Sequence, residues 1–564
     1  MGRTRAFSSP RRTRRGAEDH RGTPFLSSVS VELCVLRASV VIGLLFLCIS
    51  AAPVAFAQKL VTVPSRAPLM ELRLMVKAGS VHDPPGREGL AYLTARLVLD
   101  GSFGDPKHPV TKEKLAEITR PWGELATPQM MVDKETTTFS AAVPRDVYEL
   151  YLREVWGPMF TRPLFAADEL ERLRKETSVF VSSELRHENA ERLGLEVLDA
   201  TVLGDRYAHP VQGTVSGLAK ITRDDVLAFH RTLYVPGRAA AGVVTDSAAA
   251  GEQMRKAVAG IGQTSAAENR PEAGPRGEAE ANAVRLQAPP APPAVQGHKA
   301  LIVIQPNAIA SGIHAGFPYR LSRTHPDYWP LFVANVFFGT HRDSFGRLYQ
   351  NIREDRGYNY GNYSYLEWAP GRYVSLFPSP NTPRSHQYFS VWIRPVAHQY
   401  THFLMKALAS EVENLIKNGL TPEQVRETKD KARILYLNLA ETAGRLVGYR
   451  LDDWFYDMLD DGYMETYLKR IDAVTPEQVN GAIRKYLQVE NLQYVVITDR
   501  ATAEQLKADL PTGKNAQGKK PEEYQIEPPE KKQRILAVDK LWSEYSLKLE
   551  PGGIRVVPSG ELFK

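Results

Sequence analysis

The fold is decided by a stretch that occurs twice, Ile221-Thr-Arg-Asp-Asp-Val-Leu-Ala-Phe-His-Arg-Thr-Leu-Tyr234 and Val474-Thr-Pro-Glu-Gln-Val-Asn-Gly-Ala-Ile-Arg-Lys-Tyr-Leu487, which align without a gap. In each copy a threonine, Thr222 or Thr475, stands where a helix N-cap belongs, and acidic residues follow in the first turn. Downstream of both copies lies a similar apolar run, 243–246 or 496–499. Each copy therefore predicts a capped helix that leads into a buried strand.

Strand patterns precede each copy and repeat in the same order. Residues 60–63 with 69–76 resemble residues 301–304 with 310–317, and both sets predict pairs of strands with alternating side chains. The middle of each copy is helical in pattern, at 167–186 and 421–447. A repeat of this length is a whole domain, so we predict an α+β protein made of two homologous domains, each a mostly antiparallel sheet covered by helices.

Composition changes divide the chain further. We predict a first domain at 58–262, an Ala/Pro/Glu-rich linker at 263–298, a second domain at 299–510 and a polar C-terminal tail at 511–564. The linker includes Ala288-Pro-Pro-Ala-Pro-Pro-Ala294, a run typical of semi-rigid extended spacers. A length of 564 residues suits two to three domains of ordinary size.

The N-terminal segment predicts export. An apolar run at 38–52 is followed by Ala55-Phe56-Ala57, a small-x-small pattern for cleavage before Gln58. Residues 1–57 are therefore interpreted as a signal peptide with a long basic region, and the protein as periplasmic or secreted. The basic region is longer than usual, which leaves open a start codon further downstream. The alternative is a membrane anchor, for which the run is shorter than the ~20 residues of a spanning helix.

Cysteines and charge exclude several classes of function. Cys34 and Cys48 both precede the expected cleavage point, so the mature chain would have no disulfide, thiolate metal site or cysteine nucleophile. The net charge is +6, and much of the arginine excess lies in the first 21 residues. Without them the protein is nearly neutral, and nothing indicates a nucleic-acid partner.

Three further motifs identify a family resemblance. They are Ala78-Gly-Ser-Val-His-Asp-Pro-Pro-Gly-Arg-Glu-Gly-Leu-Ala91, His325-Pro-Asp-Tyr328 and Ile352-Arg-Glu-Asp-Arg-Gly-Tyr-Asn-Tyr360. From about residue 60 to 509 the chain resembles the insulinase/pitrilysin metallopeptidases, the inverzincins, whose zinc helix carries His-x-x-Glu-His. The resemblance implies two insulinase-like domains that face each other as a clamshell.

The chain departs from that family at the catalytic motif. Where the resemblance places His-x-x-Glu-His, the sequence reads Tyr92-Leu93-Thr94-Ala95-Arg96. Positions 92 and 96 have the one-turn spacing of two zinc ligands, but a phenol is a poor ligand at neutral pH and a guanidinium has no lone pair. Ala95 replaces the general base. The family's distal carboxylate is expected at Glu184, which cannot hold zinc alone, so we predict no metal bound by this chain.

A hidden zinc site elsewhere is the alternative. His82, His108, His187 and His209 are available, but no two of them form a helical pair with an intervening glutamate. An active metallopeptidase with relocated ligands is therefore the least favoured interpretation.

The second copy retains a different feature of the family. Arg353 and Tyr360 match an arginine and a tyrosine that such proteins present towards the scissile peptide, where they can hydrogen-bond carbonyls and stabilise an oxyanion. The structural alternative is that Arg353 pairs with Glu354 or Asp355 and that Tyr360 is a half-buried strand residue.

These features predict a non-catalytic, substrate-holding subunit of an exported insulinase-type peptidase, inactive by itself. Its partners would be a zinc-bearing subunit and an extended peptide that adds to a sheet edge. No nucleic acid and no lasting membrane insertion are expected. Four aromatic residues are candidates for lining the peptide groove: Phe317, Tyr363, Tyr365 and Trp368. The alternative is a stand-alone peptide-binding or scaffolding protein without an enzymatic partner.

Overall fold

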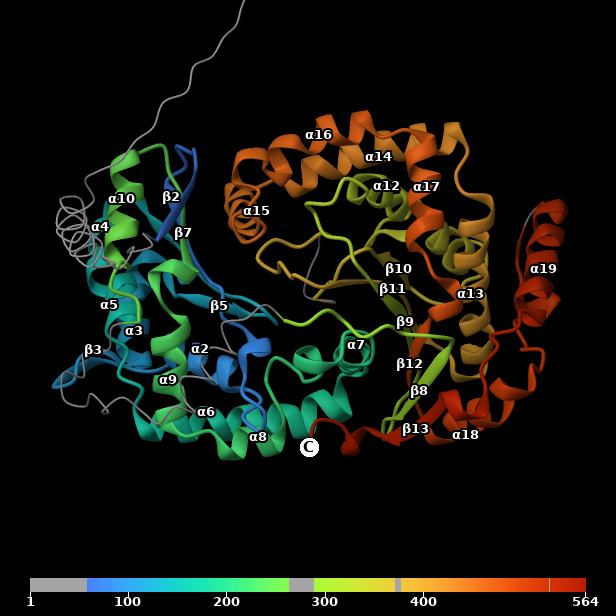
Figure 1. The fold of residues 1–564 in the computed structure, drawn as a ribbon, viewed down its shortest axis with the longest axis horizontal. Coiled ribbons are helices and arrows are strands. Elements are labelled where there is room, and N and C mark those ends of the chain that lie inside the picture. Colours follow the sequence, from blue (N-terminus) through green and yellow to red (C-terminus); the bar gives the residue numbers. More distant parts are fainter. Residues whose placement is uncertain (1–57, 263–288, 371–376, 527) are drawn as a thin grey trace, which may run out of the picture. The chain divides into compact units, whose positions relative to one another are not determined.

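The computed structural model describes residues 58–262, 289–370, 377–526 and 528–564 (Figure 1). All of the described residues belong to one compact unit. The predicted signal peptide lies outside the described residues, as does most of the predicted linker. Within the described part, no helix combines the length and the apolar character needed to span a bilayer.

The first sheet has five strands in the order β1-β7-β2-β6-β5. β1 and β7 run parallel and the remaining neighbours are antiparallel. The strands are β1 (Lys59–Val63), β2 (Leu69–Val76), β5 (Gln129–Val132), β6 (Thr137–Pro144) and β7 (Ala239–Val244).

The second sheet repeats this order as β8-β12-β9-β11-β10 and adds β13 beside β8. Again the first pair is parallel and the next three are antiparallel. The strands are β8 (Lys299–Ile304), β9 (Ser311–Tyr319), β10 (Gly361–Tyr365), β11 (Gln387–Val396), β12 (Gln493–Thr498) and β13 (Ile554–Pro558). The identical order confirms two homologous α+β halves.

One detail of the sequence prediction was wrong. The strands at 60–63 and 69–76 do not pair with each other, because β7 lies between β1 and β2. The corresponding strands of the second half are likewise separated by β12. In each half the last strand of the repeat inserts between the first two, a long-range pairing that no local pattern specifies.

Helices cover both sheets. The predicted helix starts are confirmed: Thr222 and Thr475 cap α9 and α17 through reciprocal capping boxes. The helices of the first half are α2 (Leu90–Asp100), α3 (Lys112–Thr119), α4 (Tyr148–Tyr151), α5 (Gly157–Thr161), α6 (Ala167–Val179), α7 (Ala190–Val202), α8 (Val215–Lys220), α9 (Arg223–Leu233) and α10 (Ala248–Ala257). Those of the second half are α12 (Tyr328–Gly339), α13 (Thr401–Asn418), α14 (Pro422–Leu439), α15 (Ala443–Phe455), α16 (Tyr463–Ala473) and α17 (Pro476–Tyr486).

Each half lends one helix to the sheet of the other (Figure 1). α7 packs on β9 and β12 of the second sheet, where Leu193 and Val197 join Val495 in one buried cluster. α15 packs on β1, β2 and β7 of the first sheet, where Val447 joins Met75. The two halves therefore share their hydrophobic cores.

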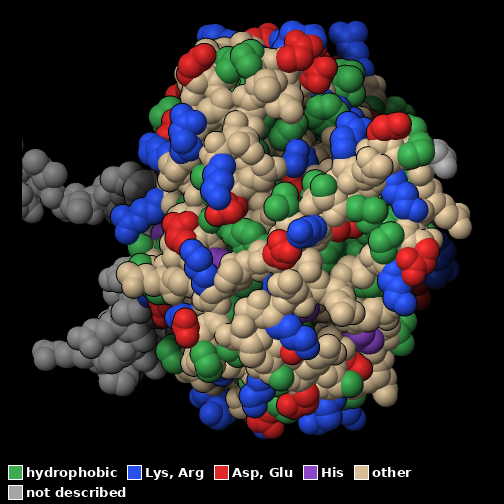
Figure 2. Space-filling view, turned by 90° about the vertical axis from the view of Figure 1, so that its right-hand side faces the viewer, with side chains coloured by type: hydrophobic (Ala, Val, Ile, Leu, Met, Phe, Trp, Pro, Cys, Tyr) green, Lys and Arg blue, Asp and Glu red, His purple; other side chains and the backbone are tan. Residues whose placement is uncertain are grey.

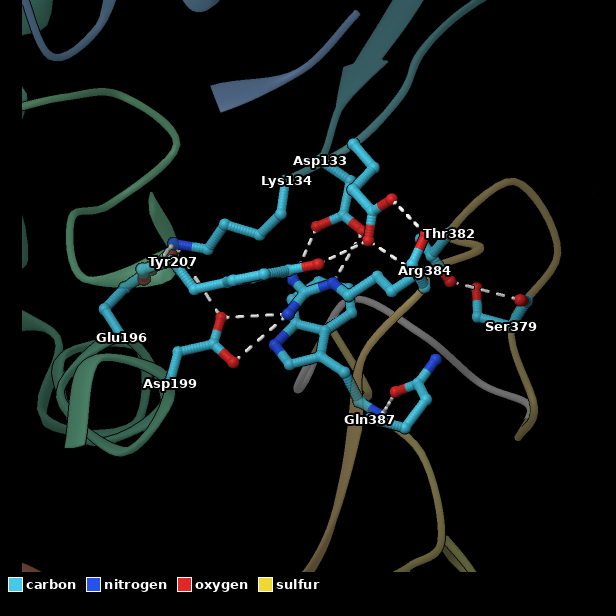
Figure 3. A network of polar contacts seen from close by, with 12 residues as sticks. Asp133, Lys134, Glu196, Asp199, Tyr207, Ser379, Thr382, Arg384 and Gln387 are labelled. Carbon is cyan, nitrogen blue, oxygen red and sulfur yellow. Dashed lines mark hydrogen bonds and ion pairs between the residues drawn. The ribbon is translucent and has the colours of Figure 1, made fainter. Parts of the chain in front are cut away.

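A buried ionic network also joins the halves (Figure 3). Arg384 of the second half is fully buried and donates to both carboxylate oxygens of Asp133, at 2.9 and 2.6 Å, and of Asp199, at 3.1 and 3.0 Å. Its guanidinium lies 3.8 Å from the centre of the Trp368 ring. Lys134 lies beside it and forms an ion pair with Glu196 at 3.3 Å. The turn at 133–134, helix α7 and the loop that carries Arg384 are thus held together by charged groups buried away from water.

The predicted polar tail is folded. It contains α19 (Pro529–Glu544) and β13, which extends the second sheet parallel to β8, and α18 (Arg500–Asp509) precedes it. Figure 1 shows α19 beside α13, a contact made through Trp542 and Phe403. On the face drawn in Figure 2, basic and acidic side chains are intermixed.

Candidate functional site

The degenerate motif lies on α2, as the resemblance implies. The backbone N–H groups of Gly89 and Ala91 at the start of α2 donate to the Asp83 carboxylate, each at 2.7 Å. Ala95 is fully buried in the core of the first half, whereas Tyr92 and Arg96 are half-buried. Residues 92 and 96 thus share a face of a real helix.

Arg96 is held by carboxylates on two helices. Its Nε donates to Asp100 Oδ2 at 2.5 Å, and its Nη2 donates to Glu176 Oε2 on α6 at 3.1 Å. Lys112 Nζ completes the cluster at 2.8 Å from Asp100 Oδ1. Burial alone would lower the pKa of Arg96, but the Asp100 carboxylate outweighs it and the pKa is raised. Burial likewise works against ionisation of Asp100, yet its two cationic partners lower its pKa.

The residues at this position do not fit a zinc ion. A guanidinium occupies the space next to the Glu176 carboxylate and brings a fixed positive charge, which repels a metal cation. Ala95 offers no proton acceptor. Within the described ranges, no group of three or more His, Cys, Asp or Glu side chains is placed to hold a metal ion.

The four histidines considered as alternative zinc ligands have different surroundings. His82 is buried against Arg238, and burial together with that cation lowers its pKa to about 3. His209 contacts the Pro210 carbonyl, and burial together with Lys134 lowers its pKa to about 4. His108 is exposed on a short strand, and His187 contacts Ser559.

The carboxylate beside Arg96 is one that sequence reasoning missed. Glu184 was expected there, but the structure places Glu176 at Arg96, and Glu184 lies on a π-helical segment, Phe180–Glu188, that continues α6. Glu184 is exposed and lines a cavity of about 740 Å³ together with Arg394 and Ser311. Glu184 lies eight positions after Glu176, roughly two helical turns further along, and no signal in the sequence predicts which of the two carboxylates faces α2.

Arg353 and Tyr360 come together at the surface of the second half. The Arg353 guanidinium lies 4.7 Å from the Tyr349 ring centre and 4.8 Å from that of Tyr360. Its Nε is 3.7 Å from Glu354 Oε1, a long and exposed ion pair. Tyr360 is 73% exposed, so it is not the half-buried strand residue of the structural alternative. Both side chains present donors to solvent next to the start of β10.

The four aromatic residues expected to line a groove do not do so. Phe317, Tyr363, Tyr365 and Trp368 are each at most 8% exposed and belong to buried clusters. Phe317 stacks on Phe389 at 5.4 Å, and Trp368 covers Arg384. That prediction was wrong because alternation along a strand shows which residues share a face, and not whether a helix covers that face.

Family models match both halves of the chain. Residues 60–214 match the model described as insulinase (peptidase family M16), and residues 220–432 match the model described as the peptidase M16 inactive domain. The chain belongs to the peptidase M16 (insulinase) family.

Two curated relatives are named as uncharacterized zinc proteases. A Bacillus subtilis protein named as an uncharacterized zinc protease, YmxG, is 21% identical over 420 residues, covering 73% of this chain and 88% of the relative. A Streptomyces coelicolor protein, also named as an uncharacterized zinc protease, is 28% identical over 302 residues, covering 51% of this chain and 56% of that protein.

Solved structures share the M16 fold. A peptidase M16 inactive domain from Pseudomonas fluorescens superposes with a TM-score of 0.61 at 20% identity, covering 78% of this chain and 94% of that one. A protease from Helicobacter pylori gives 0.62 at 15% identity, with 79% and 98% covered. The periplasmic protease PqqL from Escherichia coli gives 0.55 at 16% identity, with 78% and 44% covered.

Proposed function

We propose that this M16 homologue is a non-catalytic, peptide-holding subunit that works with a separate zinc-bearing relative. The observation that carries the proposal is the contrast between two parts of the chain, the Arg353–Tyr360 pair and helix α2. Arg353 and Tyr360 are adjacent, with side chains 32% and 73% exposed, whereas α2 carries Arg96 in ion pairs with Asp100 and Glu176. The described part of the chain offers donors for a peptide, and α2 has an alanine, Ala95, where the resemblance places the base that activates water.

In this role the two side chains act on the peptide backbone. The phenol of Tyr360 and the guanidinium of Arg353 donate hydrogen bonds to substrate carbonyls and to the oxyanion that forms when water attacks. Stacking against Tyr349 and Tyr360 restricts the guanidinium without using its N–H groups, which stay available for the peptide. The zinc and its general base are expected in the partner subunit, and both proteins in an exported compartment.

The test begins with metal content and activity of the purified chain. Elemental analysis should find no stoichiometric zinc after dialysis, and the isolated chain should not cleave an unstructured peptide. The proposal would be contradicted if the isolated chain cleaved the peptide, a chelator abolished the cleavage and added zinc restored it. That result would favour zinc-protease activity, as in the names of the two curated relatives.

The second arm uses the complex recovered from the native host. Arg353→Ala and Tyr360→Phe should each lower kcat/KM of the complex at least ~10-fold, because each removes a donor to the developing oxyanion. Arg433→Ala, which removes an exposed arginine that pairs with Asp472, is the matched control. If both site variants keep full activity, the pair has no catalytic role, and peptide binding by the chain alone then supports a stand-alone binding protein.

A further inference from the structure

The loop that carries Arg353 and Tyr360 is anchored from the interior by the C-terminal segment. Arg356 lies between the two residues, and its side chain is only 2% exposed. Its Nε donates to Asp539 Oδ1 of α19 at 2.6 Å, and its Nη2 donates to the Ile535 carbonyl at 3.2 Å. The guanidinium lies 4.1 Å from the Trp542 ring centre.

Tyr358 provides a second anchor in the same loop. Its hydroxyl accepts a hydrogen bond from the Lys519 N–H at 2.9 Å and contacts the Tyr524 hydroxyl at 3.3 Å. The Tyr524 hydroxyl in turn donates to Asp539 Oδ2 at 2.6 Å. Asp539 therefore uses its two oxygens to hold both inward-facing side chains, one directly and one through Tyr524.

The loop backbone is held as well. Lys519 Nζ donates to the carbonyls of Arg356 and Gly357 at 2.7 and 3.2 Å. Gly518 approaches so closely that a Cβ there would lie 2.8 Å from the Tyr358 hydroxyl and 2.9 Å from Phe403 Cζ. The fit of the segment under the loop leaves no room for a side chain at position 518.

Two inward-facing residues lie between Arg353 and Tyr360. Arg356 and Tyr358 are buried, whereas Arg353, three positions before Arg356, is half-buried and Tyr360, two positions after Tyr358, is exposed. The outward pair has few bonds of its own, since the nearest carboxylate to Arg353 Nε is 3.7 Å away. Its position therefore depends on the anchored backbone between the two residues.

We infer that residues 516–526 and 528–542 form a positioning element for the Arg353–Tyr360 pair, with Asp539 as its central positioning residue. The expected effect on catalysis rests on the proposed function. The segment itself lies beyond the part of the chain that the family models match. Donors that stabilise an oxyanion must be held in place before reaction, so loosening the loop should lower kcat and leave KM nearly unchanged.

The experiment compares Asp539→Ala, Asp539→Asn and Lys540→Ala. Lys540 is the adjacent exposed residue of α19 and serves as the matched control. Hydrogen exchange of peptides spanning 349–363 in the isolated chain reports on the loop without any partner. Asp539→Ala should speed exchange there at least ~10-fold, Asp539→Asn should do so less because one acceptor oxygen remains, and Lys540→Ala should have no effect.

Activity of the native complex provides the second readout. Asp539→Ala should lower kcat about as much as Arg353→Ala does, with KM within about twofold of wild type, and Asp539→Asn should restore part of the loss. Unchanged exchange in 349–363 would overturn the inference. So would unchanged kcat in Asp539→Ala when Arg353→Ala is impaired. If Arg353→Ala and Tyr360→Phe are both fully active, the proposed catalytic role of the pair fails, while the exchange result still decides whether the segment holds the loop.

Discussion

At the scale of single residues, Arg96 joins two helices. Its guanidinium on α2 bridges Asp100 on its own helix and Glu176 on α6. The family resemblance places the second histidine of a zinc motif at this position, where a metal ion would connect side chains of the same two helices. An arginine there holds the helices together electrostatically and supplies no Lewis acid.

We predict that Glu176, and not Glu184, is the carboxylate that a zinc motif introduced on α2 would use. A chain carrying Tyr92→His, Ala95→Glu and Arg96→His should bind one zinc ion that survives dialysis, because two imidazoles one turn apart would then face the Glu176 carboxylate. Elemental analysis checks it. Adding Glu176→Ala should abolish the binding and adding Glu184→Ala should not. The opposite pattern would restore Glu184 to the role expected from the sequence.

A second prediction concerns His230. It is fully buried on α9 between the rings of Phe165 and Tyr234, at 5.0 and 4.9 Å, and neither of its ring nitrogens has a hydrogen-bond partner. Burial lowers its pKa to about 3. In the unfolded chain the imidazole takes up a proton below pH ~6.5 and in the folded protein it does not, so the free energy of unfolding falls as the pH drops from 6.5 towards 3.

The His230→Phe variant should therefore lose part of this pH dependence. Between pH 7 and pH 5.5 its free energy of unfolding should fall by about 1 kcal/mol less than that of the wild type, as measured by urea unfolding. His108→Phe, at an exposed position, is the control. An identical pH dependence in His230→Phe and wild type would show that His230 is protonated in the folded protein.

At the scale of elements, the exchange of α7 and α15 between halves depends on close packing. Gly194 of α7 lies against His314 of β9, where a Cβ on Gly194 would be 2.2 Å from the imidazole Cε1. Gly242 of β7 similarly faces Val447 of α15, where a Cβ on Gly242 would lie 2.9 Å from the Val447 Cγ2. Glycines thus allow a helix of one half to approach the sheet of the other.

The Gly194→Ala substitution should accordingly destabilise the protein by ~1–3 kcal/mol, although alanine favours helix more than glycine does. Adding His314→Ala should restore much of the loss by removing the clashing ring, and thermal unfolding measures both effects. Gly481→Ala on α17, where a Cβ meets nothing within 4 Å, should be neutral or stabilising. Equal behaviour of Gly194→Ala and Gly481→Ala would contradict the packing argument.

At the scale of the whole molecule, Arg384 holds together segments that are far apart in the sequence. It pairs with Asp133 from the turn before β6 and with Asp199 from α7. Burial raises the pKa of Asp199, and the Arg384 and Lys134 cations oppose that rise. Removing the guanidinium would leave two carboxylates buried beside a single remaining ammonium group.

Arg384→Ala should lower the free energy of unfolding by ~3–5 kcal/mol, the range for breaking a buried ion pair from one side. Arg433→Ala, which removes an exposed ion pair with Asp472, should cost less than ~1 kcal/mol. Urea unfolding followed by circular dichroism measures both. A loss below 1 kcal/mol for Arg384→Ala would mean that water enters the network and screens it.

Much of this organisation was predictable from local patterns. The repeated Thr-capped helices α9 and α17 and the alternating strands can each be predicted from a short window of residues, because capping and periodicity depend on neighbours a few positions away. The replacement of the zinc motif at 92–96 and the role of Arg353 and Tyr360 as substrate contacts follow from the family resemblance instead, and both stay predictions.

What the tertiary structure alone decided depends on contacts between distant residues. The insertion of β7 and β12 into their sheets, the partnership of Arg96 with Glu176, the burial of Phe317 and Trp368, and the support of the 353–360 loop by α19 all join segments more than fifty residues apart. The residues next to a side chain in the sequence determine which face of a helix or strand it lies on. Only tertiary packing determines which element covers that face and which charged groups lie beside the side chain.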